Sequence, residues 1–319
     1  MDHASANSPE PGTSIFLTGA TGFVGQAVLD ELVARGYRVH ALVRGKQIAR
    51  EGVQTFIGDL FDDGILDAAL HGCAAAIHLV GIIREDPDKG QTFERVHFEG
   101  AKHVIDAAAR NGVRRFIHMS ALGVREDSPS AYASTKARAE AHLKQSGLDY
   151  TILRPSVIHG PRGEFMRMLA DWAHGRSMPY FFMPYFGRGV FGFGKSKVQP
   201  VYVNDVARAF VDCVKKPDLI RHAIDLAGPE QFTWPEMYGR ATEVLLGKRK
   251  LTIAFPIWYA RLLTQLAPAS MLPFNRAQVE MAGEDNTSSL DTIERHFGWT
   301  PQKFADTLRE YAAALPGEK

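Results

Sequence analysis

Cysteine is scarce in this sequence of 319 residues, and its scarcity argues against two classes of protein. Only Cys73 and Cys213 occur, and neither belongs to a Cys-x-x-Cys pair or lies near histidines at metal-ligand spacing. The sequence therefore indicates neither a disulfide framework nor a zinc site, and we expect no metal ligands. Two unpaired thiols fit the reducing environment of the cytoplasm.

An excess of charge of one sign is also missing. With 37 Lys and Arg against 36 Asp and Glu, the formal net charge is +1, and no basic run or basic stripe interleaved with aromatics occurs. We therefore do not expect a nucleic acid as partner. The first 13 residues lack the basic start and apolar centre of a signal peptide, and their small, polar composition predicts a disordered leader over residues 1–13.

Glycine, by contrast, occurs in an informative pattern. A short apolar run over residues 14–18 is followed by Gly19, Gly22 and Gly25, spaced G-x-x-G-x-x-G, and then by a helical pattern over residues 23–35. Such glycines allow a tight turn, a close approach to a pyrophosphate and close packing of the helix on the sheet, while the free N–H groups at the helix start suit an anion. A glycine-rich turn with nothing bound is the alternative. We expect cofactor contacts at Gly19, Thr21, Gly22, Phe23, Val24 and Gly25.

The end of the next strand, predicted over residues 37–43, helps to choose between nicotinamide cofactors. An acidic residue there would bind the ribose of NAD, whereas a basic one can receive the 2′-phosphate of NADP. Here Arg44 and Lys46 follow the strand. A guanidinium suits a phosphate, so these residues favour NADP(H) over NAD(H). A solvated basic turn is the alternative interpretation.

Apolar strands and amphipathic helices continue to alternate beyond this unit, which predicts an α/β fold with a doubly wound parallel sheet. Asp59 follows the third strand and could reach an adenine amino group, or it could cap the helix that starts near Asp62. Leu79, Val80 and Gly81 end the fourth strand and should border the cofactor. We expect the nucleotide-binding core over residues 14–160, completed by about 199–228. We expect a discontinuous second lobe for a substrate or partner over residues 161–198 and 229–319. The chain looks loop-rich over residues 160–194 and mostly helical over residues 229–319.

A candidate catalytic pair lies on the helix predicted over residues 130–146. Tyr132 and Lys136 are four residues apart, so they are neighbours on one helical face. A nearby lysine can lower the pKa of a phenol and anchor a ribose hydroxyl, which lets the phenol exchange a proton with a substrate beside a nicotinamide. On an isolated helix the same spacing would be an ordinary surface pair.

At this point the chain resembles the short-chain dehydrogenase/reductase superfamily with its Rossmann fold, in particular the extended and atypical members. Matching pieces are the glycine turn, Gly58-Asp59-Leu60, Tyr132-x-x-x-Lys136, the segment 153–161 and the segment 201–207. The resemblance implies further cofactor contacts at Leu60, Pro155, Val157 and Ile158. Within the superfamily the sequence is similar to NAD(P)-dependent epimerases/dehydratases and to the group related to the NAD(P)-binding accessory subunit of respiratory complex I. Membership of that group implies tightly held NADPH and often a structural or assembly role.

One departure from the family pattern bears on catalysis. Active extended members usually carry two hydroxyl residues after the fifth strand, whereas this chain has Ser120 and Ala121. The second hydroxyl polarises the substrate oxygen, and the loss of one such donor can reduce the rate by about 10²-fold or more. Ser120 is the remaining candidate. His159 occupies a position where tyrosine is frequent, and we expect it to be a packing residue.

Large apolar side chains gather outside the predicted strands, in segments 181–186, 190–193 and 255–266. In the last segment Phe255, Tyr259, Leu262, Leu263 and Leu266 fall near one helical face. These segments could line a pocket for a small hydrophobic substrate or a lipid-like quinone, contact a membrane surface or protein complex, or form the ordinary core of the second lobe. None approaches the roughly 20 apolar residues that span a bilayer.

Two classes of function are compatible with these sequence features. The first is an NADP-dependent oxidoreductase acting on a hydrophobic carbonyl, alcohol or quinone, with Tyr132 as acid/base and Lys136 as its electrostatic partner. A sugar-nucleotide epimerase or dehydratase is a less favoured enzyme. The second is a non-catalytic NADPH-binding module associated with a membrane respiratory complex. The expected location is the cytoplasm, either free or peripheral to the inner face of a membrane.

Overall fold

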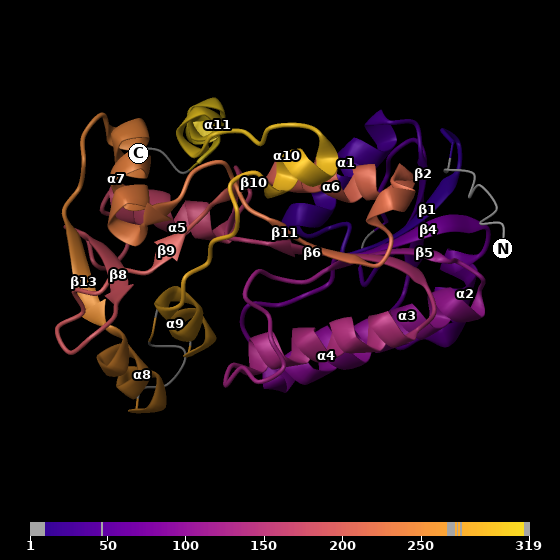
Figure 1. The fold of residues 1–319 in the computed structure, drawn as a ribbon, viewed down its shortest axis with the longest axis horizontal. Helices are drawn as coiled ribbons and strands as arrows, with labels where there is room; N and C mark the ends of the chain where they lie inside the picture. The colour runs from indigo at the N-terminus through magenta and orange to yellow at the C-terminus, as the bar shows by residue number, and fades with distance from the viewer. Residues whose placement is uncertain (1–9, 46, 267–271, 273, 275, 316–319) are drawn as a thin grey trace. The chain divides into compact units, whose positions relative to one another are not determined.

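The computed structural model describes residues 10–45, 47–266, 272, 274 and 276–315. Lys46 and the first nine residues of the predicted leader lie outside this range. The chain forms two compact units (Figure 1). The first runs to Pro155 and adds Asn204–Asp225, and the second comprises Ser156–Val203 and continues from Leu226.

A seven-stranded sheet forms the centre of the first unit, in the order β3-β2-β1-β4-β5-β6-β11. The neighbouring pairs from β3 through to β6 are parallel. The strands are β1 (Ser14–Thr18), β2 (Arg38–Val43), β3 (Val53–Ile57), β4 (Cys73–His78), β5 (Arg115–Met119), β6 (Asp149–Pro155) and β11 (His222–Leu226). The predicted doubly wound parallel sheet is thus confirmed, and its order reverses between β1 and β4. In open sheets of this kind, ligands bind where the order reverses, outside the carboxyl ends of the strands.

Helices cover both faces of this sheet (Figure 1). On one face lie α1 (Phe23–Ala34) and α6 (Val203–Lys215), joined where Arg35 pairs with Asp212 at 2.6 Å. On the other lie α2 (Asp63–Leu70), α3 (Gly100–Arg110) and α4 (Ala131–Gln145). Their apolar faces build a continuous core with the sheet, which includes Phe16, Leu66, Leu70, Val104, Ile105, Phe116, Leu143 and Ile152. Burial on both faces explains the apolar runs of the central strands β1 and β4.

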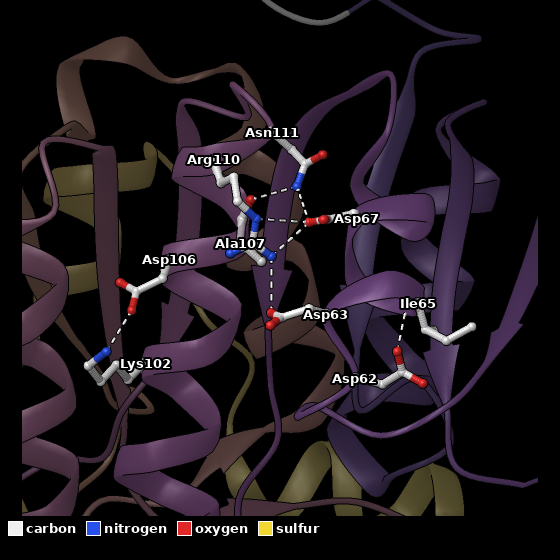
Figure 2. Close-up of polar contacts among 9 residues, drawn as sticks. All are labelled: Asp62, Asp63, Ile65, Asp67, Lys102, Asp106, Ala107, Arg110 and Asn111. Carbon is white, nitrogen blue, oxygen red and sulfur yellow. Dashed lines mark hydrogen bonds and ion pairs between the residues drawn. The ribbon is translucent and has the colours of Figure 1, made fainter.

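Polar contacts fix α2 against α3 (Figure 2). Asp62 is the N-cap of α2, and its side chain accepts a hydrogen bond from the Ile65 N–H at 3.1 Å. Asp67 accepts from Asn111 Nδ2 at 2.6 Å and from Arg110 Nη2 at 2.8 Å, and these two bonds lower the pKa of its carboxyl. The cap that the sequence left open between Asp59 and Asp62 therefore belongs to Asp62.

The helical region before β5 consists of two segments. A π-helical turn over Glu94–Glu99 precedes α3. Such turns are rare in proteins, and those that occur are often found at functional sites. Short 3₁₀ turns occur at Pro87–Lys89, Pro217–Leu219 and Ala312–Ala314.

The second unit is mostly helical, as predicted for its carboxyl-terminal part. Its helices are α5 (Glu164–Ala173), α7 (Trp234–Leu246), α8 (Ile257–Leu266), α9 (Arg276–Gly283), α10 (Thr292–Phe297) and α11 (Phe304–Tyr311). Three small strand pairs accompany them: β7 (Ile158–His159) with β10 (Val201–Tyr202), β9 (Lys197–Val198) with β12 (Phe232–Thr233), and β8 (Met183–Gly187) with β13 (Thr252–Pro256).

Two local expectations for the chain beyond residue 160 were wrong. Residues 160–194 are not merely loop-rich, because they contain α5 and β8. Phe255 belongs to β13, so the apolar helix begins only at Ile257.

Gly25 lies where the fold leaves no room for a side chain. A Cβ at this position would lie 1.8 Å from the Gly19 carbonyl oxygen, so α1 would have to move away from the turn. We predict that Gly25→Ala lowers the free energy of unfolding by about 2 kcal/mol or more, because the clash is with backbone. Chemical denaturation of the purified variant measures this loss.

The matched control is Gly64→Ala in α2, where a Cβ would meet nothing closer than 3.5 Å. Alanine is the better helix former, so this variant should be neutral or up to about 1 kcal/mol more stable. A Gly25→Ala protein as stable as the wild type would show that α1 does not depend on this close approach.

Candidate cofactor and catalytic site

The glycine turn lies at the point where the strand order reverses. Gly19 has a φ of +76°, which favours glycine, and a Cβ there would lie 3.3 Å from the Leu79 backbone. The ends of β1 and β4 are joined beneath it, because Thr18 Oγ1 lies 2.8 Å from His78 Nδ1 and accepts a hydrogen bond from the Leu79 N–H at 3.3 Å. The turn therefore brings the backbone of residues 19–25 to the carboxyl edge of both central strands.

The start of α1 is suited to an anion. Gly22 is its N-cap and supplies no side-chain cap, and the first turn contains no acidic residue. The first N–H groups of a helix have no intrahelical acceptor, so those of Phe23, Val24 and Gly25 are available to phosphate oxygens. Thr21 is exposed, and its carbonyl accepts a hydrogen bond from Gln26 Nε2 at 2.9 Å. The residues present at this turn fit a dinucleotide pyrophosphate.

The residues expected near the adenosine half lie at the carboxyl ends of β2 and β3. Arg44 follows buried Val43, is exposed, and makes no ion pair within residues 10–45 or with the rest of the described chain. Asp59 is exposed, and its Oδ1 accepts a hydrogen bond from the Phe61 N–H at 3.1 Å, while Leu60 is half-buried. Both charged groups remain accessible to a ligand.

Lys136 is buried in α4, with only 4% of its surface exposed. Its Nζ donates a hydrogen bond to the Met119 carbonyl at 3.2 Å and lies 5.7 Å from the centroid of the Tyr132 ring. A Cβ on Gly81 would lie 3.5 Å from the same Nζ, so the loop after β4 passes directly over the ammonium. The structure thus brings Lys136, Tyr132 and Gly81 together at the carboxyl edge of the sheet.

Burial sets the acid–base state of the pair. It lowers the pKa of Lys136 to about 8 and raises the pKa of the half-buried Tyr132 to about 12. The expectation that the lysine lowers the pKa of the tyrosine is therefore wrong for the protein alone, because desolvation outweighs the attraction of an ammonium 5.7 Å from the ring. Near pH 7 the phenol is protonated and the lysine mostly charged.

His97 is a member of this site that the sequence did not reveal. Its ring packs edge-on to the Tyr132 ring, with centroids 5.1 Å apart, and a Cβ on Gly81 would lie 3.6 Å from its Nε2. Its Nδ1 lies 3.3 Å from the Thr135 hydroxyl, and its Nε2 lies 3.0 Å from both the backbone nitrogen and the carbonyl oxygen of Ile82. Burial and the charge of Lys136 lower the pKa of His97 to about 2. A neutral imidazole in the π-helical turn therefore positions both α4 and the loop after β4.

Two further buried histidines lie near the carboxyl ends of β4 and β5. His78 and His118 are paired residues of β4 and β5, and their rings stack with centroids 5.6 Å apart. Burial lowers both pKa values, that of His118 to about 3, so both rings are neutral. Among the residues that the structure describes, neither nitrogen of His118 nor Nε2 of His78 has a hydrogen-bond partner.

Ser120 follows β5 and is buried, with its N–H donating to the Leu153 carbonyl at 2.8 Å. Its Oγ has no partner within the described ranges. A buried hydroxyl without a partner retains its full capacity to bind a ligand. Ala121 beside it is half-buried and offers no hydroxyl.

The residues expected from the segment 153–161 divide between the two units. Pro155 ends β6, and its carbonyl accepts a hydrogen bond from the Leu122 N–H at 2.9 Å. Val157 and Ile158 belong to the second unit, where Ile158 pairs with Val201. His159 is fully buried and lies 3.0 Å from the Tyr311 hydroxyl through Nδ1, which makes it the packing residue that we expected.

The described part of the chain contains no candidate metal site, that is, no group of three or more His, Cys, Asp or Glu residues that could hold an ion. Cys73 and Cys213 are free and buried, and burial raises the pKa of both thiols to about 12.

The part of the chain that carries this site is similar to known proteins. Residues 19–170 match the model of a family described as NAD(P)H-binding. The chain is 29% identical over 290 residues to NADH dehydrogenase (ubiquinone) 1 alpha subcomplex subunit 9 of Arabidopsis thaliana mitochondria, covering 86% of this chain and 68% of that protein. It is also 29% identical over 242 residues to the ceramide reductase of Caulobacter vibrioides, covering 74% and 72% of the two chains.

The fold has relatives of known structure. A short-chain dehydrogenase/reductase superfamily protein from Agrobacterium tumefaciens, solved with bound NAD, superimposes with a TM-score of 0.70 over 94% of this chain and 96% of its own, at 20% identity. At this identity the likeness establishes the fold. The match to the NAD(P)H-binding family, over residues 19–170, lies mostly within the first unit.

The lowered pKa of Lys136 predicts a pH dependence of stability. Because this pKa is about 8 in the folded chain against an ordinary value of 10.5, the unfolded chain holds more protons between pH 8 and 10.5. The contribution of Lys136 to stability therefore rises with pH across that window, by up to about 1.4 kcal/mol per pH unit. The measurement is the difference in free energy of unfolding between wild type and Lys136→Met from pH 7 to 11, which should rise between pH 8 and 10.5.

Lys144→Met is the control, since Lys144 is an exposed lysine of the same helix. Its difference from the wild type should change little across the window. A wild type minus Lys136→Met difference that stays flat with pH would mean that the folded ammonium is not desolvated.

Proposed function

We propose that this NAD(P)H-binding protein with the short-chain dehydrogenase/reductase fold is an NADP(H)-dependent oxidoreductase that acts on a hydrophobic carbonyl, alcohol or quinone-like substrate. The observation that carries the proposal is the pairing of the Tyr132 phenol with the buried Lys136 ammonium on one face of α4. Residues of the glycine turn supply phosphate-binding groups at the same carboxyl edge of the sheet.

The chemistry follows from the protonation states of the two groups. A bound nicotinamide supplies or accepts a hydride. Tyr132, with a pKa of about 12, holds its proton at neutral pH and can donate it to a substrate oxygen. The Lys136 ammonium, held by the Met119 carbonyl, stabilises the phenolate that remains. This arrangement suits reduction, in which the phenol is the general acid.

Ser120 completes the proposed constellation. Its unpartnered hydroxyl is the remaining donor that could polarise a substrate oxygen, since position 121 is alanine. His97 positions Tyr132 and the loop at Gly81 and takes no part in proton transfer, because its imidazole stays neutral.

A hydrophobic substrate class is supported by two relatives. One is named for ceramide reduction and the other is a subunit of a ubiquinone-dependent dehydrogenase. Ceramide and ubiquinone are both lipids with polar oxygen-bearing groups, so we assign the substrate to the lipid-like ketones and quinones.

A non-catalytic role is the second candidate, and Ala121 favours it. With only one hydroxyl after β5, the site could hold NADPH as a structural ligand and transfer no hydride. The relationship to a mitochondrial NADH dehydrogenase subunit supports the same view, with the protein acting as a module of a larger complex.

The preference for NADP(H) depends on Arg44. We predict that Arg44→Ala weakens NADPH binding by about tenfold or more, the value of one charge-assisted hydrogen bond, and leaves NADH binding nearly unchanged. Fluorescence titration of the purified protein with each cofactor measures both constants.

Arg38→Ala is the matched control, because Arg38 is an exposed arginine at the opposite end of the same strand. It should leave both affinities unchanged. Equal affinity of the wild type for NADPH and NADH would refute the assignment of Arg44 to the 2′-phosphate.

The catalytic proposal depends on Tyr132. We predict that Tyr132→Phe lowers the rate of NADPH oxidation by about 10²- to 10⁴-fold with a short-chain ubiquinone analogue or a long-chain ketone as acceptor, because the proton donor is lost. NADPH binding should be retained. Stopped-flow absorbance at the nicotinamide band measures the rate.

Tyr150→Phe, in β6 and packed on the core, is the control and should turn over as the wild type does. A wild type that binds NADPH tightly and oxidises it with neither class of acceptor would favour the structural role. Unchanged turnover in Tyr132→Phe would remove this tyrosine from the mechanism.

A further inference from the structure

Two segments of the second unit contain no acidic residue. Residues 172–204 carry Arg176, Arg188, Lys195 and Lys197 with no Asp or Glu, and residues 244–279 carry Lys248, Arg249, Lys250, Arg261 and Arg276 with none. Nine basic residues thus stand in two acid-free segments of a chain whose net charge is only +1. Three of the nine, Arg176, Arg188 and Arg249, pair with carboxylates outside the segments, so the local excess of positive charge rests on the other basic residues.

The structure joins these two segments. Strand β8 pairs in parallel with β13 along its whole length, from Met183 with Thr252 to Gly187 with Pro256 (Figure 1). After β8 the chain forms a turn over residues 188–194, which is closed by two backbone hydrogen bonds between Arg188 and Gly194. After β13 the chain continues into α8. The Trp258 indole N–H donates to the Val190 carbonyl at 3.0 Å, so the turn and the start of α8 lie side by side.

Large apolar side chains are exposed on these segments. Of the 15 large hydrophobic residues described as exposed, 12 lie within residues 172–204 and 244–279. The group at the turn and α8, which we call the apolar tip, comprises Val190, Phe191, Phe193, Trp258, Tyr259 and Leu262. Phe191 and Phe193 are 73% and 77% exposed, so for these residues the expectation of an ordinary core is wrong. Contiguous exposed apolar residues of this kind mark an interaction surface.

Charged groups border the apolar tip. A shallow groove beside it is lined by Arg188, Trp258 and Arg261, and also by Glu280 and Glu284 of the segment around α9. Arg188 also pairs with Asp285 at 2.7 Å. The acidic groups therefore lie toward α9, while Arg261 accompanies the aromatic side chains on α8.

We propose that the apolar tip docks on the surface of an anionic lipid bilayer. Aromatic rings prefer the level of the lipid headgroups, and the basic residues of the two acid-free segments are attracted to anionic lipids. A second copy of the chain fits less well, because it would bring basic segments against basic segments. Within the described part of the chain no helix has the length and apolarity to cross a bilayer, so the contact is interfacial.

The proposal goes beyond the oxidoreductase assignment and does not depend on it. Co-sedimentation uses the full-length protein with vesicles of phosphatidylcholine, alone or mixed with phosphatidylglycerol. The wild type should partition strongly only into the mixed vesicles. Phe191→Ser with Phe193→Ser should reduce the partition coefficient about tenfold or more, and Arg261→Gln about fivefold.

Leu290→Ser is the matched control, since Leu290 is 55% exposed and lies outside the two segments. It should partition as the wild type does, and retained NADPH binding shows that each variant is folded. Trp258 fluorescence should shift to the blue on mixed vesicles, and Trp258→Phe should remove the shift.

Two results would overturn the proposal. One is equal partitioning of the wild type and the Phe191/Phe193 double variant, including the absence of vesicle binding in both. The other is a concentration-dependent dimer of the wild type that the double variant loses, since that would assign the apolar tip to a second copy. Turnover is not read in this experiment, so either result leaves the oxidoreductase proposal unaffected, and failure of turnover leaves membrane docking unaffected.

Discussion

The close approach of Gly25 to the Gly19 carbonyl is the constraint on which the rest of the site depends. With no side chain at position 25, the start of α1 packs directly onto the turn after β1. Gly19 can then lie against the backbone of Leu79, which brings the ends of β1 and β4 together. Because the sheet order reverses between these strands, the helix start, with its free N–H groups, stands at the edge where a ligand can be held.

The same edge holds a buried charge. Lys136 is removed from water and held by a single backbone carbonyl, and His78, His97 and His118 are kept neutral by burial and by its charge. Burying an ammonium costs free energy, and well-packed apolar residues in its place would not carry this cost. A group of this kind is typical of functional sites, where a perturbed acid–base group is needed. The Ser120 hydroxyl, which has no partner among the described residues, and the protonated Tyr132 phenol are the groups that the proposed reaction would use beside this charge.

Local patterns predicted the fold of the first unit and the motif residues of its site. The glycine turn, the apolar strands and the Tyr132 and Lys136 pair are short-range features, and element boundaries mostly differ from expectation by one or two residues. The features that the sequence missed arise from contacts between distant residues. His97 reads as an ordinary histidine of a helix until the π-helical turn places it against Tyr132, and the pairing of β8 with β13 joins residues about 70 apart. The raised pKa of Tyr132 depends on burial, which no motif reports.

The central claim is that one dinucleotide contacts both the start of α1 and the group around Lys136. Hydrogen–deuterium exchange of the full-length protein, with and without saturating NADPH, tests this claim most directly. We expect slower exchange on binding in two separate regions, residues 18–26 and the segments around Gly81 and Ser120. Protection confined to residues 18–26 would contradict the claim, because the ligand would then not reach Lys136.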